Sequence, residues 1–292
     1  MLTFDEKMVE ILNEIQGGFE WVWKQMSFQV NWYENYFWFL TLLSLLVWGL
    51  EIAFPWRKNQ KVIRRNFWLD AFYMYFNFFI FTSVISVFYK LIEINFPFDL
   101  TKMAILDLSR LPHWLALVIF FILNDFVQWF THFLLHRYNF LWNFHKVHHS
   151  VKEMGFAAHL RYHWMENILY KPLKTLVVLL IVGGEPNDAF IVHFISIAIG
   201  HLNHANIKIT WGPLKYVFNN SVMHLWHHVK ALPNDRKQGV NFGISLSLWD
   251  YIFGTNYIPK VDGNIELGFE NDEKFPIDNF GKQLIYPIGK KD

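Results

Sequence analysis

Long apolar segments separated by short polar ones dominate the first half of the 292-residue chain. A helix needs about 20 largely apolar residues to cross the roughly 30 Å hydrocarbon core of a bilayer. Residues 36–54 meet this requirement with one charge, Glu51, near the end, and residues 71–89 carry no charge. A third segment, 114–136, is interrupted only by an asparagine and by Asp125. The pattern predicts three membrane-spanning helices.

Two shorter apolar segments follow, residues 176–182 and 189–200, and the run Gly-Gly-Glu-Pro-Asn-Asp at 183–188 separates them. Glycine and proline in such a run interrupt a helix. Neither segment is long enough to cross the bilayer alone. We expect a helical hairpin that enters and leaves on the same side, or two half-buried helices, within an all-α polytopic membrane bundle.

Charges in the loops predict how the chain is oriented. Five basic residues lie in 57–65, whereas residues 1–35 carry six acidic residues against Lys7 and Lys24. Because basic loops stay in the cytoplasm, we expect the 57–65 loop there, the N-terminus and residues 95–112 outside, and the third span returning to the cytoplasmic side near residue 132. The first residues lack a basic segment followed by an apolar one, so the first span is expected to direct insertion.

Composition agrees with a membrane protein and narrows the chemistry. Hydrophobic residues make up 53% of the chain and charged residues 17%, whereas soluble domains carry roughly 25% charged residues. The net charge of +1 gives no general basic field for a nucleic-acid partner. The absence of cysteine excludes disulfides, thiol nucleophiles and cysteine-ligated zinc or iron–sulfur sites within this chain. Any metal must therefore be held by nitrogen or oxygen.

Eight of the 14 histidines fall into three dense clusters. Residues at i, i+3 and i+4 share one face of a helix, so an HxxHH sequence aims its imidazoles at one region. Imidazole suits iron, copper, zinc and nickel, and eight ligands exceed what one tetrahedral zinc uses. The pattern favours two metals. The clusters are HxxxH at His132 and His136, HxxHH at His145, His148 and His149, and HxxHH at His224, His227 and His228.

Histidine also has other uses. A single histidine in an apolar helix is usually an ordinary core residue, which is our interpretation of His113 and His193. A pH sensor also uses clustered histidines, but it does not need the repeated HxxHH spacing.

The clusters and the residues around them resemble the fatty acid hydroxylase and sterol desaturase superfamily of membrane di-iron oxygenases, most of all its alkylglycerol monooxygenase-like and bacterial members. The similarity includes Asp125 seven residues before His132, Trp-Asn-Phe-His at 142–145, and the segments 241–243 and 248–255. It covers about residues 113–257. We therefore expect a catalytic region at 113–257, an N-terminal helix with two spans at 1–112, and a polar cytosolic tail at 258–292.

The resemblance implies a ninth ligand, His204, from the helix before the last cluster, with His201 one turn earlier left open. The segment 161–166 resembles an Arg-x-His-Pro-x-Glu motif but has Trp164 in place of proline. A metal role for His163 is therefore left open, and Arg161, His163 and Glu166 are interpreted as lying around the ligands or the substrate. The implied metal ligands are His132, His136, His145, His148, His149, His204, His224, His227 and His228.

Asp125 is expected to act on a ligand. A carboxylate inside a membrane span is costly and usually has a partner, and His132 lies two turns along the same helical face. We expect Asp125 to accept the N–H of this imidazole and so fix its tautomer. The alternative is that Asp125 forms bonds across helices together with Asn124 and Gln128. The residues predicted for the catalytic site besides the metal ligands are Asp125, Arg161 and Asn241.

The resemblance implies an integral-membrane non-haem di-iron oxygenase with two Fe²⁺ ions and O2 as co-substrate. The substrate is expected to be a lipid that enters from the bilayer, and hydroxylation is favoured over desaturation. No flavin, nicotinamide or haem motif is visible, so an external ferredoxin- or cytochrome-type donor with its reductase is expected. The expected location is a bacterial inner membrane, with the active site on the cytoplasmic side.

Two functions from other classes compete with this one. A membrane carrier of metal or haem would place histidine pairs in the middle of its spans, whereas these clusters lie beyond the helix ends. A zinc-dependent membrane hydrolase would normally place a general-base carboxylate within the motif, as in HExxH, and none occurs here.

Overall fold

The computed structural model describes residues 3–96, 105–106, 108, 110–182, 186–259 and 265–288. Every regular element in these ranges is a helix, and β-pairing there is limited to the isolated bridges Phe218–Leu246 and Val229–Leu267. The predicted all-α fold is confirmed. The central part of the predicted 95–112 loop lies largely outside the described residues.

Three helices in the described ranges are long and apolar enough to cross a membrane: α2 (Tyr36–Ala53), α3 (Phe67–Asn95) and α4 (His113–Arg137). The predicted three spans are therefore confirmed. Helix α3 begins four residues before the predicted start, and this first turn contains Asp70. Burial of Asp70 is compensated by ion pairs at 2.6 Å with Arg64 and 2.9 Å with Arg161, and a paired charge is tolerated where a lone one is not.

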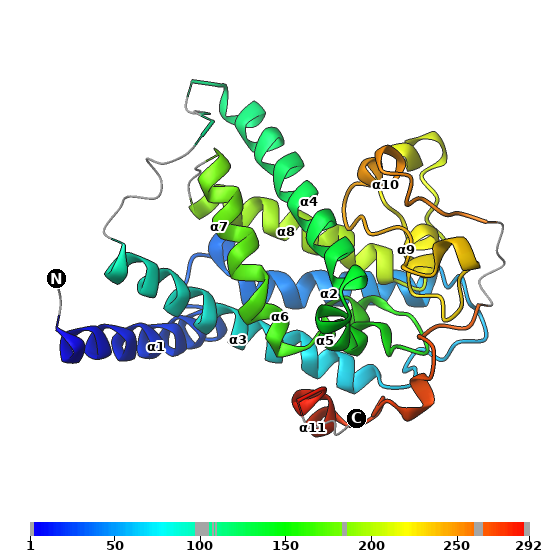
Figure 1. Ribbon diagram of the computed structural model, residues 1–292, viewed down its shortest axis with the longest axis horizontal. Coiled ribbons are helices and arrows are strands. Elements are labelled where there is room, and N and C mark those ends of the chain that lie inside the picture. Colours follow the sequence, from blue (N-terminus) through cyan, green and yellow to red (C-terminus); the bar gives the residue numbers. More distant parts are fainter. Residues whose placement is uncertain are drawn as a thin grey trace.

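The two helices expected for the hairpin are α7 (Lys171–Val182) and α8 (Pro186–His204), and α7 packs against α4 (Figure 1). Helix α8 continues four residues past the predicted apolar segment. This extension brings His201 and His204 into the last turn of α8, next to the remaining clusters. Residues 183–185 of the predicted helix-breaking run lie outside the described residues.

The histidine-rich segments form short helices at the C-terminal ends of α4 and α8 (Figure 1). Helix α5 (Asn139–His149) begins directly after α4, separated by the extended residue Tyr138. Helix α9 (Ser221–His227) begins after Asn220, whose side chain accepts hydrogen bonds from the backbone N–H groups of Val222 and Met223. These N–H groups lie in the first turn and have no hydrogen-bond partner within the helix.

The segment expected as a polar tail packs onto this helical cap. Phe269 and Phe275 form an apolar cluster with Tyr73 of α3 and Val147 of α5. The hydroxyl of Tyr73 donates a 2.8 Å hydrogen bond to the side chain of Gln283. The remaining helical elements are α1 (Phe4–Met26), η1 (Trp32–Glu34), η3 (Phe156–Leu160), α6 (Trp164–Leu169), η4 (Gly212–Tyr216), η5 (Asn234–Arg236), α10 (Leu248–Ile252), η6 (Asp272–Lys274) and α11 (Phe280–Ile285).

Candidate metal centre

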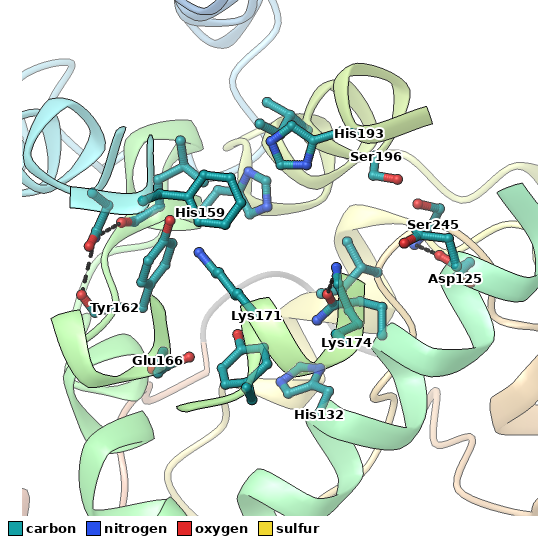
Figure 2. A pocket seen from close by; sticks show the side chains of 18 of the residues that line it. Asp125, His132, His159, Tyr162, Glu166, Lys171, Lys174, His193, Ser196 and Ser245 are labelled. Atoms are coloured by element: carbon teal, nitrogen blue, oxygen red, sulfur yellow. Dashed lines mark hydrogen bonds between the residues drawn. The ribbon is translucent and has the colours of Figure 1, made fainter. Parts of the chain in front are cut away.

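A cavity of about 630 Å³ lies between the membrane helices α3 and α4 and the hairpin α7–α8 (Figure 2). One part of its lining is strongly apolar and includes Phe81, Ile85, Val178 and Phe190. Another part is formed by four of the predicted ligands, His132, His145, His148 and His204. The cavity therefore joins an apolar space to the histidine clusters.

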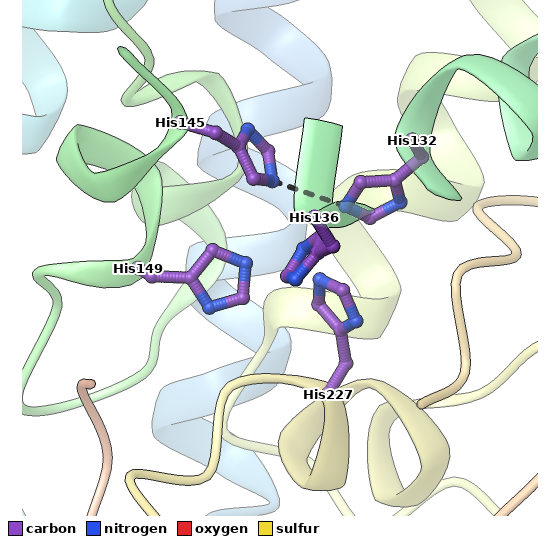
Figure 3. Close-up of side chains that lie close together, drawn as sticks. All are labelled: His132, His136, His145, His149 and His227. Atoms are coloured by element: carbon purple, nitrogen blue, oxygen red, sulfur yellow. Dashed lines mark hydrogen bonds between the residues drawn. The ribbon is translucent and has the colours of Figure 1, made fainter. Parts of the chain in front are cut away.

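All nine predicted ligands lie in two compact groups, within each of which one ligand nitrogen per residue lies within 4.8 Å of the others. Figure 3 shows the first group, in which imidazoles from α4, α5 and α9 point toward a common centre. The first group is His132, His136, His145, His149 and His227, and the second is His148, His204, His224 and His228.

Each HxxHH motif contributes to both groups. In α5 the i, i+4 pair His145 and His149 belongs to the first group, and His148 belongs to the second. In α9 and its C-cap residue His228 the assignment is reversed, because His227 joins the first group while the i, i+4 pair His224 and His228 joins the second. Residues four apart stand nearly above one another on a helix, whereas the residue between them points to one side. The motif spacing is therefore suited to two neighbouring metals.

Backbone carbonyls fix the orientation of four of these imidazoles. A carbonyl oxygen only accepts hydrogen bonds, so the Nδ1 atom that faces it must carry the proton. The Nε2 atom then has the lone pair that binds a metal. The four hydrogen bonds join the Nδ1 atom of a histidine to a carbonyl oxygen: His132 to Phe242 O at 2.7 Å, His227 to Val240 O at 2.7 Å, His148 to Arg161 O at 3.0 Å, and His204 to Gly200 O at 2.7 Å.

The Nε2 atoms approach one another in a way that fits a bound cation. The distance is 3.4 Å between His204 and His148, and 3.2 Å between His132 and His145. In the first pair both Nδ1 atoms face carbonyls, so two lone pairs face each other and repel unless a cation lies between them. Metal–nitrogen bonds of about 2.1 Å place neighbouring ligand atoms roughly 3.0–3.4 Å apart. The donor set therefore fits two nitrogen-ligated metal ions.

Burial keeps these imidazoles neutral. Removal from water lowers the pKa of His145 and of His148 to about 3, because the charged imidazolium loses its hydration. Burial, and then repulsion by His228, lowers the pKa of His149 well below its usual value. Neutral imidazoles keep their lone pairs available for a metal.

The predicted bond between Asp125 and His132 is wrong. The Asp125 carboxylate accepts hydrogen bonds of 3.1 Å each from Ser245 N, Leu246 N and Trp249 Nε1, while His132 Nδ1 donates to Phe242 O. The carbonyl already occupies the position beside the imidazole. Asp125 thus bonds to the 245–249 segment, whereas the alternative expected bonds across helices together with Asn124 and Gln128. Asp125 thereby holds the loop that carries this carbonyl.

Asn241 and Arg161 lie next to carbonyls that orient ligands. Asn241 adopts a left-handed conformation with φ 53°, which asparagine tolerates better than most residues, and its side chain donates to Met223 O at 2.9 Å. Arg161 is fully buried and pairs with Asp70 at 2.9 Å. Neither side chain belongs to a histidine group. Their geometry supports positioning of the loops that hold ligands.

Three further polar residues considered in the sequence analysis have distinct places. His163 is bound to the backbone, with Nε2 3.0 Å from Leu284 O, and lies outside both groups. Glu166 Oε1 lies 3.4 Å from His145 Nδ1, beside a ligand. His193 stacks on Tyr36, with ring centres 5.6 Å apart.

Sequence reasoning missed four residues near the site. Asp250, which the sequence analysis includes only within the segment 248–255, accepts from Phe242 N at 2.8 Å and holds the same loop as Asp125. His159, Lys171 and Lys174 line the cavity. The two lysines could have been found from the sequence, because they are charged residues at the start of an otherwise largely apolar helix, α7.

Residues 117–255 match the family model named fatty acid hydroxylase. The chain is 29% identical over 189 residues to an ornithine lipid hydroxylase of Rhizobium tropici, covering 62% of this chain and 55% of that protein. It is 27% identical to an alkylglycerol monooxygenase of Caenorhabditis elegans, covering 51% of this chain and 28% of that protein. It is 26% identical to methylsterol monooxygenase 1-1 of Arabidopsis thaliana, covering 48% and 46%.

The alignments thus cover about a quarter to about half of the length of these curated relatives. No solved structure matches the chain significantly. All three relatives are named as hydroxylases or monooxygenases. The matched region contains all nine grouped histidines. Residues 117–255 are thus similar to the fatty acid hydroxylase family, and the predicted resemblance to the fatty acid hydroxylases and sterol desaturases is confirmed.

Proposed function

We propose that this protein is an integral-membrane non-haem di-iron oxygenase that hydroxylates a C–H bond of a lipid. One observation carries the proposal: imidazoles from both groups of buried histidines line the same cavity as a set of apolar side chains. An apolar cavity of this size accommodates a lipid chain. The names of the related hydroxylases and monooxygenases support the reaction class.

When bound, two Fe²⁺ ions supply the reductive activation of O2 that oxidation of an unactivated C–H bond requires. The protein's own contribution is to hold and orient the reactants. Four backbone carbonyls fix the imidazole tautomers, and the apolar lining excludes water and aligns the substrate chain. We favour hydroxylation over desaturation because the related proteins are named for oxygen insertion.

The electrons come from a separate protein under this proposal. The sequence contains no flavin, nicotinamide or haem motif, so a ferredoxin- or cytochrome-type donor with its reductase is required. The basic 57–65 loop supports a cytoplasmic location for the histidine groups. We propose a bacterial inner membrane as the location, in line with the bacterial relative.

The test combines metal analysis with turnover. Protein purified from iron-replete cells should contain two irons per chain, with a Mössbauer spectrum free of sulfur ligation. Lipid profiles of a deletion strain and a complemented strain should differ by a hydroxylated lipid that forms only with O2. One zinc per chain and O2-independent cleavage of a lipid would favour a hydrolase, and reversible metal or haem transfer without turnover would favour a carrier.

A further inference from the structure

His159 is a histidine of the cavity wall that belongs to neither group of proposed metal ligands (Figure 2). It lies in η3, which packs against α3 and α8, and its ring centre is 5.0 Å from that of His204 in the second group. A Cβ atom at Gly200 would collide with the His159 ring, so this glycine leaves room for the imidazole beside α8. His159 therefore lies next to the proposed metal centre without being part of it.

A chain of hydrogen bonds determines which nitrogen of His159 carries the proton. The hydroxyl of Ser44 in α2 donates to Leu40 O at 2.7 Å, and because a hydroxyl has one proton, its oxygen accepts from His201 Nε2 at 3.1 Å. Charging a buried imidazole is costly, so each ring carries one N–H. His201 Nδ1 is then unprotonated and accepts from His159 Nδ1 at 2.8 Å. The other nitrogen of His159, Nε2, is left with a lone pair.

This lone pair is a hydrogen-bond acceptor that the described part of the chain leaves open. None of the described residues forms a hydrogen bond with His159 Nε2. A lone pair accepts from an O–H or N–H group, whereas an ether, ester or tertiary amide offers only further acceptors. A polar atom without a partner is unfavourable beside apolar side chains. The acceptor therefore favours a ligand that brings a donor to this part of the wall.

The membrane helices give such a ligand a direction. Phe120 and Val178 line the same cavity and pack together with Val192 in an apolar cluster. Phe120 lies twelve residues before His132 in α4, and Val192 lies twelve residues before His204 in α8, which is about 18 Å of helix in each case. The apolar cluster thus lies far along both helices from the proposed ligands. A donor held at His159 is at the metal end, and an attached chain extends toward the apolar cluster.

Resting on the proposed function, we propose that His159 Nε2 accepts a hydrogen bond from an O–H or amide N–H group of the lipid substrate. This group lies beside the second histidine group, so the oxidised carbon is within a few bonds of it. The apolar chain occupies the space toward Phe120 and Val178. The inference assigns a substrate class, lipid alcohols or secondary amides, and a region of attack near their polar end.

The experiment compares ligands that differ in one donor. Purified, iron-loaded protein in nanodiscs of neutral lipid is equilibrated with radiolabelled hexadecanol or hexadecyl methyl ether, and with N-methylhexadecanamide or N,N-dimethylhexadecanamide. Specific binding is the excess over empty nanodiscs. The selectivity ratio is the affinity for the probe with a donor divided by the affinity for its methylated partner. Partition of the probes into the lipid is the same for every variant, so it cancels when ratios are compared between variants.

Two variants remove the acceptor in different ways. His159→Leu removes the imidazole, whereas Ser44→Ala keeps it and releases the tautomer of His201, which allows the N–H of His159 to move to Nε2. Ser86→Ala is the matched control, because its hydroxyl donates to Thr82 O at 3.0 Å within α3.

His159→Leu should lower the selectivity ratio about 3- to 10-fold for at least one probe pair, which is the size of one neutral hydrogen bond. Ser44→Ala should lower the same ratio by a smaller factor, about two- to fivefold, because part of the population keeps the original tautomer. Ser86→Ala should match the wild type, and all three variants should hold two irons per chain. The pair with the larger loss identifies the donor as an alcohol or an amide.

Three outcomes would overturn the inference. They are the absence of specific binding of both donor probes to the wild type, an unchanged ratio for both pairs in His159→Leu, and loss of iron from His159→Leu, which would make His159 a metal ligand. If His159→Leu does not fold, Ser44→Ala serves as the test, and an unchanged ratio in that variant overturns the inference.

Iron content and O2-dependent turnover of the wild type, measured on the same samples, separate this inference from the proposed function. A wild type that lacks iron and oxidises no lipid refutes the proposed function, whatever the selectivity ratios are. A wild type that holds two irons and oxidises a lipid, with the same ratios in His159→Leu, refutes only the role of His159.

Discussion

His159 and His201 face each other through their Nδ1 atoms, 2.8 Å apart. The Ser44 hydroxyl donates to Leu40 O at 2.7 Å, so its oxygen accepts from His201 Nε2 at 3.1 Å. His201 Nδ1 is then unprotonated and accepts from His159 Nδ1. His159 is left with the lone pair on Nε2, in the lining of the cavity, while His201 has both nitrogens bound by protein.

This relationship predicts that His201 is not a metal ligand. His201→Ala should keep two irons per chain, because both of its nitrogens are engaged away from the histidine groups. His204→Ala, one turn later in α8, should reduce bound iron to about one per chain, since it removes a member of the second group. Metal analysis of both purified variants checks this, and the reverse pattern would contradict the assignment.

Single ligand losses should be specific to one metal. His136→Ala should empty the first group and His224→Ala the second, and both should abolish turnover, because a closed site has no substitute ligand. Mössbauer spectra of the two variants should each retain a different one of the two iron signals. His113→Ala, which lies outside both groups, serves as the control and should retain iron and most activity. His193→Ala also lies outside both groups and should retain iron, although His193 lines the cavity. Full activity of several ligand variants in folded protein would refute the oxygenase proposal.

Asp125 should act through the loop that it holds. Asp125→Ala leaves the backbone N–H groups of Ser245 and Leu246 without their acceptor, and each buried unsatisfied donor costs about 1–3 kcal/mol. Thermal unfolding in detergent should reveal this loss. Asp125→Asn keeps one acceptor oxygen and should lower metal affinity or activity about 10- to 100-fold. Unchanged stability of the alanine variant would show that the loop does not depend on this carboxylate.

Gly200 provides a test of the His159 position. A Cβ atom at Gly200 would collide with the imidazole of His159, and Gly200 O also orients His204 at 2.7 Å. Gly200→Ala should therefore displace His159 and weaken iron binding in the second group. Gly49→Ala is the matched control, since no atom lies within 4 Å of its Cβ, and it should be neutral or stabilise α2 by up to about 1 kcal/mol. Iron titration and thermal unfolding of both variants test this prediction, and wild-type iron affinity in Gly200→Ala would contradict it.

The charge distribution predicts the topology of the chain. Reporter fusions at positions 10, 60, 105 and 285 should report outside, inside, outside and inside, because the basic residues concentrate in 57–65. A reporter at 285 that reads outside would place the C-terminal segment on the face opposite to the 57–65 loop. That result would contradict a hairpin formed by α7 and α8.

Local chemistry allowed the spans and the candidate ligands to be predicted from the sequence. A run of about 20 apolar residues has few alternatives to a membrane helix, so α2, α3 and α4 lie where the pattern predicted them. The i, i+3, i+4 spacing of each HxxHH motif follows from the pitch of a helix. Eight of the proposed ligands could therefore be named from their spacing alone, whereas the ninth, His204, was implied by the family resemblance. The metal binding of all nine stays a prediction.

Only the tertiary structure decided which partners these residues have. His132 bonds to Phe242, 110 residues away, and Asp125 to Ser245, 120 residues away, and no local periodicity encodes such distances. The division of each HxxHH motif between two groups depends on how α5 and α9 pack against α4 and α8. The same packing places Lys171 and Lys174 in the lining of the cavity. What a side chain faces within a bundle depends on the neighbouring helices and not on its own segment alone.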